Sequence, residues 1–345
     1  MRKIGIAASV GVAILALTAC GGGTSSSTST GAGAASTVAA KDMRLVNVVK
    51  LVGVGWFDRM GVGVTEFAKQ TGIDATQTGA DDASPEKQVK VIQDLIAQKP
   101  TAITVVPNSP EALEATLKRA QDQGIIVVTH EASNQKNMNA DIEAFDNKAY
   151  GAQIMDGLSK CMGGEGQYAA FVGNLTAKTH MEWVQGALDQ ATAKYPKIQR
   201  VVDPIESKEN ESVAYDRTKE ILAKYPNIKG FQGSAGTDVA GIARAVQEAG
   251  LVGKVCVMGT SIPSVASKYL KDGSINKIYF WDPAMAAEAM LTIAQRLASG
   301  QTVEAGTNLG IKGYESLTVS KDNPKVFYGN AAITVDLSNI NEYSF

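Results

Sequence analysis

Aromatic and hydrogen-bonding side chains follow short apolar runs throughout this sequence. Both of its histidines and two of its three tryptophans occupy such positions. Flat rings pack against C–H faces and planar polar groups bind hydroxyls, so this combination is typical of a carbohydrate or polyol site. The candidate binding residues are Lys50, Trp56, Phe57, Asp82, Asn108, His130, Glu131, Thr179, His180, Ser234, Ser261, Trp281 and Asp282.

Several of these candidates also have a purely structural interpretation. Trp56 and Phe57 could form a hydrophobic staple for the following helix, and His130 could be a satisfied loop histidine. Asp82 and Glu131 could be solvated turn residues. The third tryptophan, Trp183, falls inside a helical pattern, and we expect it to pack in the core.

Patterns that would indicate catalysis are weak. The two histidines have no cysteine partner, so no nucleophilic constellation is apparent, and no metal-ligand spacing is recognisable. Gly53-Val54-Gly55 follows an apolar run, but Gly61 is too distant for a dinucleotide fingerprint, and no phosphate loop is present. We therefore expect no enzymatic activity, cofactor or metal.

The elements that must position the candidates alternate along the chain. β-branched runs are separated by amphipathic stretches, and Ser84-Pro85-Glu86 and Ser109-Pro110-Glu111 are both helix-start signals. Such alternation predicts parallel sheets with helices on both faces, where ligands bind beyond the carboxyl ends of the strands. Strands are expected near 45–49, 74–78, 102–106, 125–129, 168–172, 198–202, 228–232, 255–258 and 275–280. Residues 306–345 break the alternation and are expected to form a strand-rich tail.

Composition limits the architecture and the partners. About 300 residues beyond residue 43 are enough for two domains of ordinary size. Because ten or so strands in one open sheet would be unusual, two lobes with one sheet each fit better. The formal net charge of −2 argues against nucleic acid as a partner. We expect a monomer.

The N-terminal segment reads as an export signal. Met1-Arg2-Lys3 is followed by an apolar run that is too short to span a bilayer comfortably. Leu17-Thr18-Ala19-Cys20 resembles the lipobox of bacterial lipoproteins, which implies cleavage before Cys20 and lipid on that cysteine. An ordinary signal peptide cut near Ala19 is the alternative. The Gly/Ser/Thr-rich stretch that follows is typical of a flexible tether.

Two further cysteines remain, Cys161 and Cys256. Export permits a disulfide between them. Cys256 lies in the apolar run 255–258, however, where a small buried thiol is the simpler interpretation. The sequence leaves both alternatives open.

From Arg44 onward the chain resembles the type I periplasmic sugar-binding proteins of ABC importers, in the branch that contains autoinducer-2 and rhamnose binders. The motifs that carry the resemblance are 50–57 (KLVGVGWF), 124–129 (GIIVVT), 259–263 (GTSIP), 280–283 (FWDP) and 340–345 (INEYSF). The resemblance implies two Rossmann-like lobes joined by hinge crossings near Asn147, Trp281 and Gly306. It divides the chain into a signal peptide (1–19), a tether (20–43), an N-terminal lobe (44–147 with 281–305) and a C-terminal lobe (148–280 with 306–345).

The resemblance also implies a site and partners. Lys50 matches a ligand-contacting lysine of the autoinducer-2 binder, whereas Glu131, Thr179 with His180, and Ser234 with Gly236 differ chemically from their counterparts. These differences favour a small neutral ligand, such as a pentose, a deoxyhexose or a short-chain polyol like xylitol or threitol, over autoinducer-2. The implied partner is a membrane-embedded ABC permease, and the implied location is the outer face of the cell membrane. The alternatives are autoinducer-2 binding, and ligand sensing through a membrane receptor without transport.

Overall fold

The alternating pattern folds as two mostly parallel sheets flanked by helices, in a computed structural model that describes residues 38–345. Strands rich in Val and Ile and buried on both faces are typical of parallel sheets covered by crossover helices. The predicted α/β architecture with two Rossmann-like lobes is confirmed.

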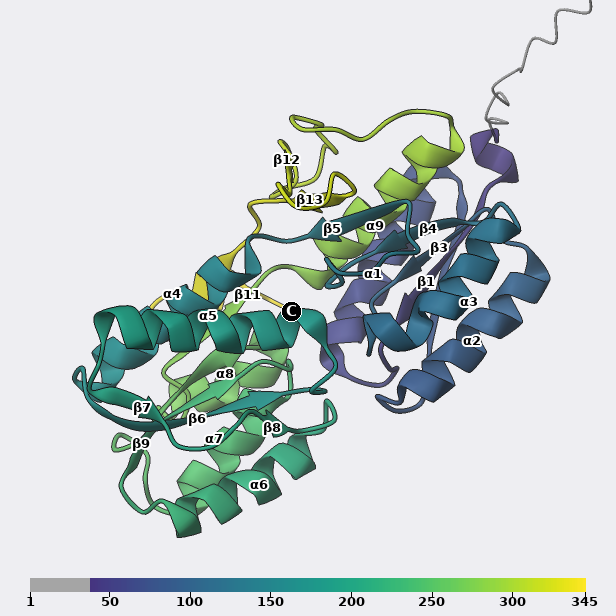
Figure 1. Ribbon diagram of the computed structural model, residues 1–345. Helices are drawn as coiled ribbons and strands as arrows, with labels where there is room; N and C mark the ends of the chain where they lie inside the picture. Colours follow the sequence, from purple (N-terminus) through teal and green to yellow (C-terminus); the bar gives the residue numbers. More distant parts are fainter. Residues whose placement is uncertain (1–37) are drawn as a thin grey trace, which may run out of the picture. The chain divides into compact units, whose positions relative to one another are not determined.

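The N-terminal lobe is built on a seven-stranded sheet with the order β12-β13-β5-β4-β3-β1-β2. Its neighbouring strands pair in parallel except β12 with β13. Figure 1 shows α2 and α3 on one face of this sheet and α1 and α9 on the other. The elements are β1 (Arg44–Val49), α1 (Gly55–Thr71), β2 (Asp74–Gly79), α2 (Pro85–Gln98), β3 (Ala102–Val105), α3 (Pro110–Asp122), β4 (Ile126–Thr129), β5 (Ala140–Glu143), α9 (Pro283–Ala298), β12 (Thr318–Val319) and β13 (Val326–Tyr328).

The C-terminal lobe contains the second sheet, with the order β14-β11-β10-β9-β6-β7 and β8 beside β6. Only β14 runs antiparallel, against β11. Helices α4 and α5 cover one face and α6 lies on the other (Figure 1). The elements are α4 (Asn147–Met162), β6 (Gly166–Val172), α5 (Lys178–Lys194), β7 (Ile198–Arg200), β8 (Ile205–Glu206), α6 (Glu211–Lys224), β9 (Ile228–Gly233), α7 (Asp238–Glu248), β10 (Cys256–Thr260), α8 (Pro263–Lys271), β11 (Lys277–Phe280) and β14 (Ile333–Val335).

Local sequence signals set the helix starts. Ser84 Oγ accepts a hydrogen bond from the Lys87 N–H, and Ser109 Oγ accepts one from Ala112, so both predicted Ser-Pro-Glu starts are confirmed. Within residues 38–345, no helix combines the length and apolar character needed to cross a membrane.

The predicted signal peptide and Cys20 fall within residues 1–37, outside the described part of the chain. The tether expected to run to residue 43 ends earlier. The Val38 N–H donates to the Ala298 carbonyl at 2.9 Å, a 3-10 turn η1 follows at Ala40–Asp42, and Met43 is buried. Residues 38–43 therefore belong to the folded N-terminal lobe.

The chain passes between the sheets three times. The first two passages follow β5 and β11, near Asn147 and Trp281 as expected. The third lies between β13 and β14, at residues 329–332, and the expectation of a crossing near Gly306 is wrong. The reason is that β13 pairs in parallel with β5, which keeps the tail with the first sheet as far as Tyr328.

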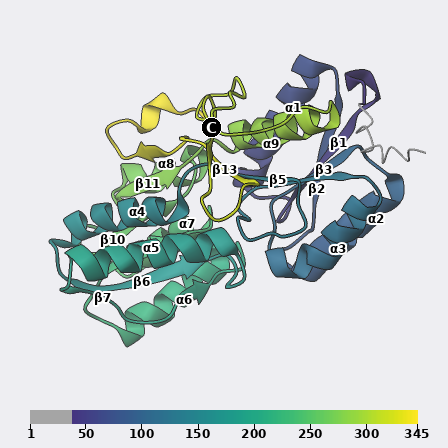
Figure 2. The same ribbon diagram turned by 45° about the horizontal axis from the view of Figure 1, so that its top comes forward.

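The same pairing divides the tail between the lobes. We expected all of 306–345 in the C-terminal lobe, but β12 and β13 extend the first sheet and only β14 joins the second. In Figure 2, β13 of the C-terminal tail lies beside β5 of the first sheet. The Gly329 and Ala331 N–H groups donate to the carbonyls of Glu143 and Ala144, so the third passage runs alongside the first.

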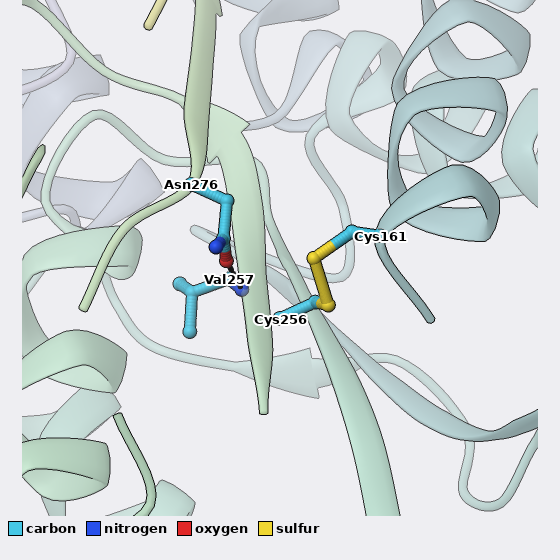
Figure 3. Close-up of a disulfide and its surroundings, with 4 residues drawn as sticks. All are labelled: Cys161, Cys256, Val257 and Asn276. Carbon is cyan, nitrogen blue, oxygen red and sulfur yellow. Dashed lines mark hydrogen bonds between the residues drawn. A yellow bond between two sulfur atoms is a disulfide. The ribbon is translucent and has the colours of Figure 1, made fainter. Parts of the chain in front are cut away.

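A disulfide joins Cys161 at the end of α4 to Cys256 on β10 (Figure 3). Helix α4 packs across β10, which brings the two Cα atoms to 6.1 Å, within the usual range for a bridge. The interpretation of Cys256 as a free buried thiol is therefore wrong. The bridge lies wholly within the C-terminal lobe and closes a separation of 95 residues.

Candidate functional site

A small cavity lies where the carboxyl ends of the two sheets face each other. Its volume is about 10 Å³, close to the least that holds one water molecule. Hollows of about 570 and 820 Å³ lie along α6 and the tail, but they are open surface features without buried charges. The cavity is the candidate site because it combines strand ends, aromatic rings and buried charges. It is lined by Lys50, Trp56, Phe57, Glu131, His180, Trp183, Glu209, Ser234, Gly236, Thr260 and Trp281.

The N-terminal lobe supplies a lysine and a glutamate from the carboxyl ends of β1 and β4, which flank β3 in the sheet. Lys50 follows β1 and Glu131 lies two residues beyond β4. Lys50 Nζ donates to Glu131 Oε2 at 2.6 Å, and both side chains are almost fully buried. A third charged group reaches this pair from the C-terminal lobe, because Glu209 Oε1 lies 3.6 Å from Lys50 Nζ.

Electrostatics keep Lys50 charged despite its burial. Desolvation would lower the pKa of Lys50, but the charges of Glu131 and Glu209 outweigh it and raise that pKa above its usual value. Burial raises the pKa of Glu209, and the lysine only partly opposes this. One ammonium group is thus shared by two carboxylates in a region closed to water.

Both glutamates have left-handed backbone conformations, with φ of 59° at Glu131 and 55° at Glu209. This conformation costs a non-glycine residue roughly 1–2 kcal/mol. Strain of this kind collects at functional sites, where the surrounding structure fixes a side chain in place. Here it points two carboxylates at the same lysine.

His180 contributes a neutral imidazole from the first turn of α5. Its Nδ1 accepts a hydrogen bond from the Gly173 N–H at 3.0 Å, so the proton of the neutral ring is on Nε2. Burial, together with the charge of Lys50, holds the pKa of His180 well below its usual value of 6.5. Nε2 lies 3.3 Å from Lys50 Nζ, so two donors face each other. An oxygen atom placed between them would accept from both.

Three tryptophans form the apolar wall of the cavity. The rings of Trp56 and Trp281 meet edge to face with centroids 4.7 Å apart, and Trp183 meets Trp281 at 5.6 Å. The Trp183 Nε1–H donates to Asn147 Oδ1 at 2.8 Å, at the end of the first hinge passage, where α4 begins. One buried apolar cluster therefore extends through both lobes at the site.

His130 lies behind this wall and does not line the cavity. Its Nε2 accepts from the Trp281 Nε1–H at 3.2 Å, and its Nδ1–H donates to the Ile142 carbonyl. Burial lowers the pKa of His130, which keeps the ring neutral. Both ring nitrogens are engaged, so His130 orients Trp281 rather than facing a ligand.

Three other predicted residues are also buried near the cavity but do not line it. Asn108 donates to the Lys50 carbonyl at 2.8 Å and accepts from Asn174 of the opposite lobe at 3.2 Å. Ser261 Oγ donates to the Gly236 carbonyl at 2.7 Å. Thr179 Oγ1 is buried without a hydrogen-bond partner among residues 38–345.

The two predicted aspartates lie elsewhere. Asp82 is exposed and pairs with Lys87 at 2.7 Å, which fits the solvated-turn interpretation. Asp282 accepts two hydrogen bonds from Arg59 and caps α9 through the Ala284 N–H. Asp282 therefore stabilises the second hinge passage.

Sequence reasoning missed Glu209, and it placed Trp183 in the core alone. Trp183 is buried as expected, but it also lines the cavity. Glu209 follows β8, a strand of only two residues that has no hydrophobic pattern to reveal it. The only available signal was the polar run 206–211, which resembles an ordinary loop.

These features describe a two-lobed α/β protein with a candidate site between its lobes. Residues 45–302 match the family model of the periplasmic binding protein domain, and the chain belongs to that family.

The individual relatives have low sequence identity to this chain. The xylitol-binding protein of Mycolicibacterium smegmatis is 25% identical over 327 residues, which cover 94% of this chain and 87% of that protein. Among solved structures, LsrB from Clostridium saccharobutylicum in complex with AI-2 has a TM-score of 0.81 at 23% identity, covering 88% of this chain and all of the other. A solute-binding protein from Clostridium phytofermentas with bound L-rhamnose has a TM-score of 0.79 at 23% identity, covering 87% and 98%.

Proposed function

We propose that this protein captures a small neutral sugar or polyol between its lobes and delivers it to an ABC permease. The observation that carries the proposal is the composition of the cavity, where indole rings from both lobes face buried hydrogen-bonding groups from both lobes. Rings pack against the carbon skeleton and charged groups bind hydroxyls strongly. The names of the relatives, which mention xylitol and L-rhamnose, point to the same ligand class.

The proposed residue roles follow from the geometry. Trp56, Trp183 and Trp281 would pack on the ligand, while Glu131 would accept its hydroxyl protons. A hydroxyl oxygen between Lys50 and His180 would receive a hydrogen bond from each.

Binding requires movement, because about 10 Å³ is far smaller than a pentose. Opening at the three passages would separate Lys50 and Glu131 on one lobe from His180 and Glu209 on the other. Closure onto a ligand would then replace the contacts between the lobes by contacts to hydroxyls. We further propose that lipid on Cys20 anchors the protein at the outer face of the membrane, near the permease.

A ligand screen tests the proposal. A ligand at about 100 times its Kd adds roughly 2.7 kcal/mol to the free energy of unfolding. We expect the melting temperature to rise with at least one of xylitol, threitol, D-arabinose, D-allose and L-rhamnose. No rise with any of them would refute the ligand class, and a rise with autoinducer-2 alone would assign the protein to that signal instead.

A variant then ties binding to the cavity. Glu131→Gln should weaken the best ligand by about 1–3 kcal/mol, since the amide accepts hydroxyl hydrogen bonds less strongly. Glu111→Gln, at an exposed position on α3, is the matched control. Equal affinities of the two variants would place the ligand elsewhere.

A further inference from the structure

Glu209 is the one acidic group that the C-terminal lobe directs into the cavity. Its loop is fastened to the end of β6, because the Ser207 N–H and Oγ both donate to the Val172 carbonyl and the Lys208 N–H donates to the Gly173 carbonyl. The Glu209 side chain is buried, with 7% of its surface exposed. These bonds fix the loop although it contains two consecutive residues with positive φ.

Gly173 makes room for this carboxyl group. A Cβ atom added at Gly173 would lie 2.3 Å from Glu209 Oε1, closer than any stable contact. The same glycine supplies the N–H that fixes the tautomer of His180. The end of β6 is therefore shaped around both residues that the C-terminal lobe presents to Lys50.

The carboxyl group is not satisfied by the protein. Among residues 38–345, Glu209 Oε1 has no hydrogen-bond partner, and the nearest cation, Lys50, is 3.6 Å away and bonded to Glu131 at 2.6 Å. With His180 neutral, one ammonium group faces two carboxyl groups, so the lining of the cavity carries no surplus positive charge. A buried acceptor without a partner indicates that a donor comes from outside the protein.

We propose that Glu209 is a specificity-determining residue, whose Oε1 accepts a hydrogen bond from a ligand hydroxyl and whose charge excludes acidic sugars. The ligand class is thus narrowed to polyols and sugars without a carboxylate or phosphate group. This inference rests on the proposed function. It assigns to Glu209 a role separate from that of Glu131, whose charge is already matched by Lys50.

The test compares Glu209→Gln with the wild-type protein. Calorimetry measures the affinity for the best neutral ligand from the screen and for its matched acid, such as D-xylose with D-xylonate or D-galactose with D-galacturonate. Acids that bind too weakly for a direct titration are measured by their displacement of the neutral ligand. The amide keeps the shape of the side chain and leaves the Lys50–Glu131 pair intact. We expect the preference for neutral over acidic ligand to shrink by about tenfold or more. Glu220→Gln, which removes an exposed charge from α6, should leave the preference unchanged.

A second variant changes the position of the Glu209 carboxyl group and leaves its charge in place. Gly173→Ala should displace the carboxyl group and weaken the neutral ligand by about tenfold, while circular dichroism confirms folding. If wild type binds a neutral ligand and Glu209→Gln keeps the wild-type preference, the role of Glu209 is refuted and the proposed function stands. If wild type binds no neutral ligand, the proposed function fails first.

Discussion

The two lobes supply the site in different ways. The N-terminal lobe places Lys50 and Glu131 within two residues of the ends of β1 and β4, and the two side chains form a hydrogen-bonded ion pair. The C-terminal lobe presents His180 from a helix and Glu209 from a loop beyond a two-residue strand, and it leaves one carboxylate oxygen without a hydrogen-bond partner. The charges from the N-terminal lobe are therefore paired within the protein. In our proposal, the carboxylate from the C-terminal lobe receives its hydrogen bond from a ligand.

The two lobes also differ in the interactions that hold each of them together. The N-terminal lobe has a second buried cluster between its sheet and helices α2 and α3, which includes Ile92, Ile103 and Leu117. The C-terminal lobe instead has the bridge between Cys161 and Cys256. The lobe that carries the unsatisfied charge is thus the one with a covalent link.

The largest effect should come from removing the shared cation. Lys50→Met leaves two buried carboxylates uncompensated, and breaking a buried pair in this way costs about 3–5 kcal/mol. We expect the free energy of unfolding in urea to fall by that amount at pH 7, and by less at pH 5, where Glu209 with its raised pKa can take up a proton. Lys208→Met, an exposed neighbour, should change it by less than about 0.5 kcal/mol. Equal free energies of unfolding for Lys50→Met and wild type would show that the two lobes do not share the charge of Lys50.

Removing the bridge should have the next largest effect. The double variant Cys161→Ser with Cys256→Ser should lose about 2–4 kcal/mol of stability, because the unfolded chain regains the freedom of a long loop. Unfolding in urea measures this loss. Wild type treated with a reductant also lacks the bridge, and it should show the same loss. Ligand affinity should stay within about twofold, since neither cysteine lines the cavity. A large affinity loss would mean that the C-terminal lobe depends on the bridge for the geometry of its site.

The aromatic wall allows a test on the N-terminal side. Trp56→Ala should weaken ligand binding by about 1.5–3 kcal/mol, the value of one large apolar side chain. Trp56→Phe keeps an aromatic ring, and it should lose less than half of the binding free energy that Trp56→Ala loses. Calorimetry measures both affinities. If the alanine variant binds normally, Trp56 only staples α1 to the core.

His180 gives a smaller effect that depends on pH. Because its folded pKa lies well below 6.5, the unfolded state binds more protons there, and stability falls as pH drops below that value. The penalty grows as the pH is lowered further below 6.5, because the unfolded state takes up the proton more readily than the folded state. The stability of wild type relative to His180→Gln should therefore be lower at pH 5 than at pH 7. A difference independent of pH would mean that the pKa of His180 is the same in the folded and unfolded states.

The sequence predicted most of the fold because its signals are local. Runs such as 102–106 and caps such as Ser84 report the strand or helix that contains them. β5 and the third crossing could not be predicted, since the place of 326–328 depends on pairing with a strand almost 200 residues earlier.

The site was predictable to the extent that it follows strand ends. That rule found Lys50, Glu131 and Trp281, but it also selected Asp82 and Asp282, whose charges are used by Lys87 and Arg59. It could not find Glu209, because no regular pattern marks β8. The direction of a side chain, which decides between cavity and surface, depends on contacts that no single segment encodes.

The positions of the tryptophans have an optical consequence. The sequence contains three, and all of them line the cavity, one from each lobe and one from a hinge passage. The whole indole emission of the protein therefore originates at its site, with rings close enough to exchange excitation energy. Opening of the lobes would separate Trp56 from Trp183 and expose both to water. The unlabelled protein should thus report its own opening and closing as a change in fluorescence colour and intensity.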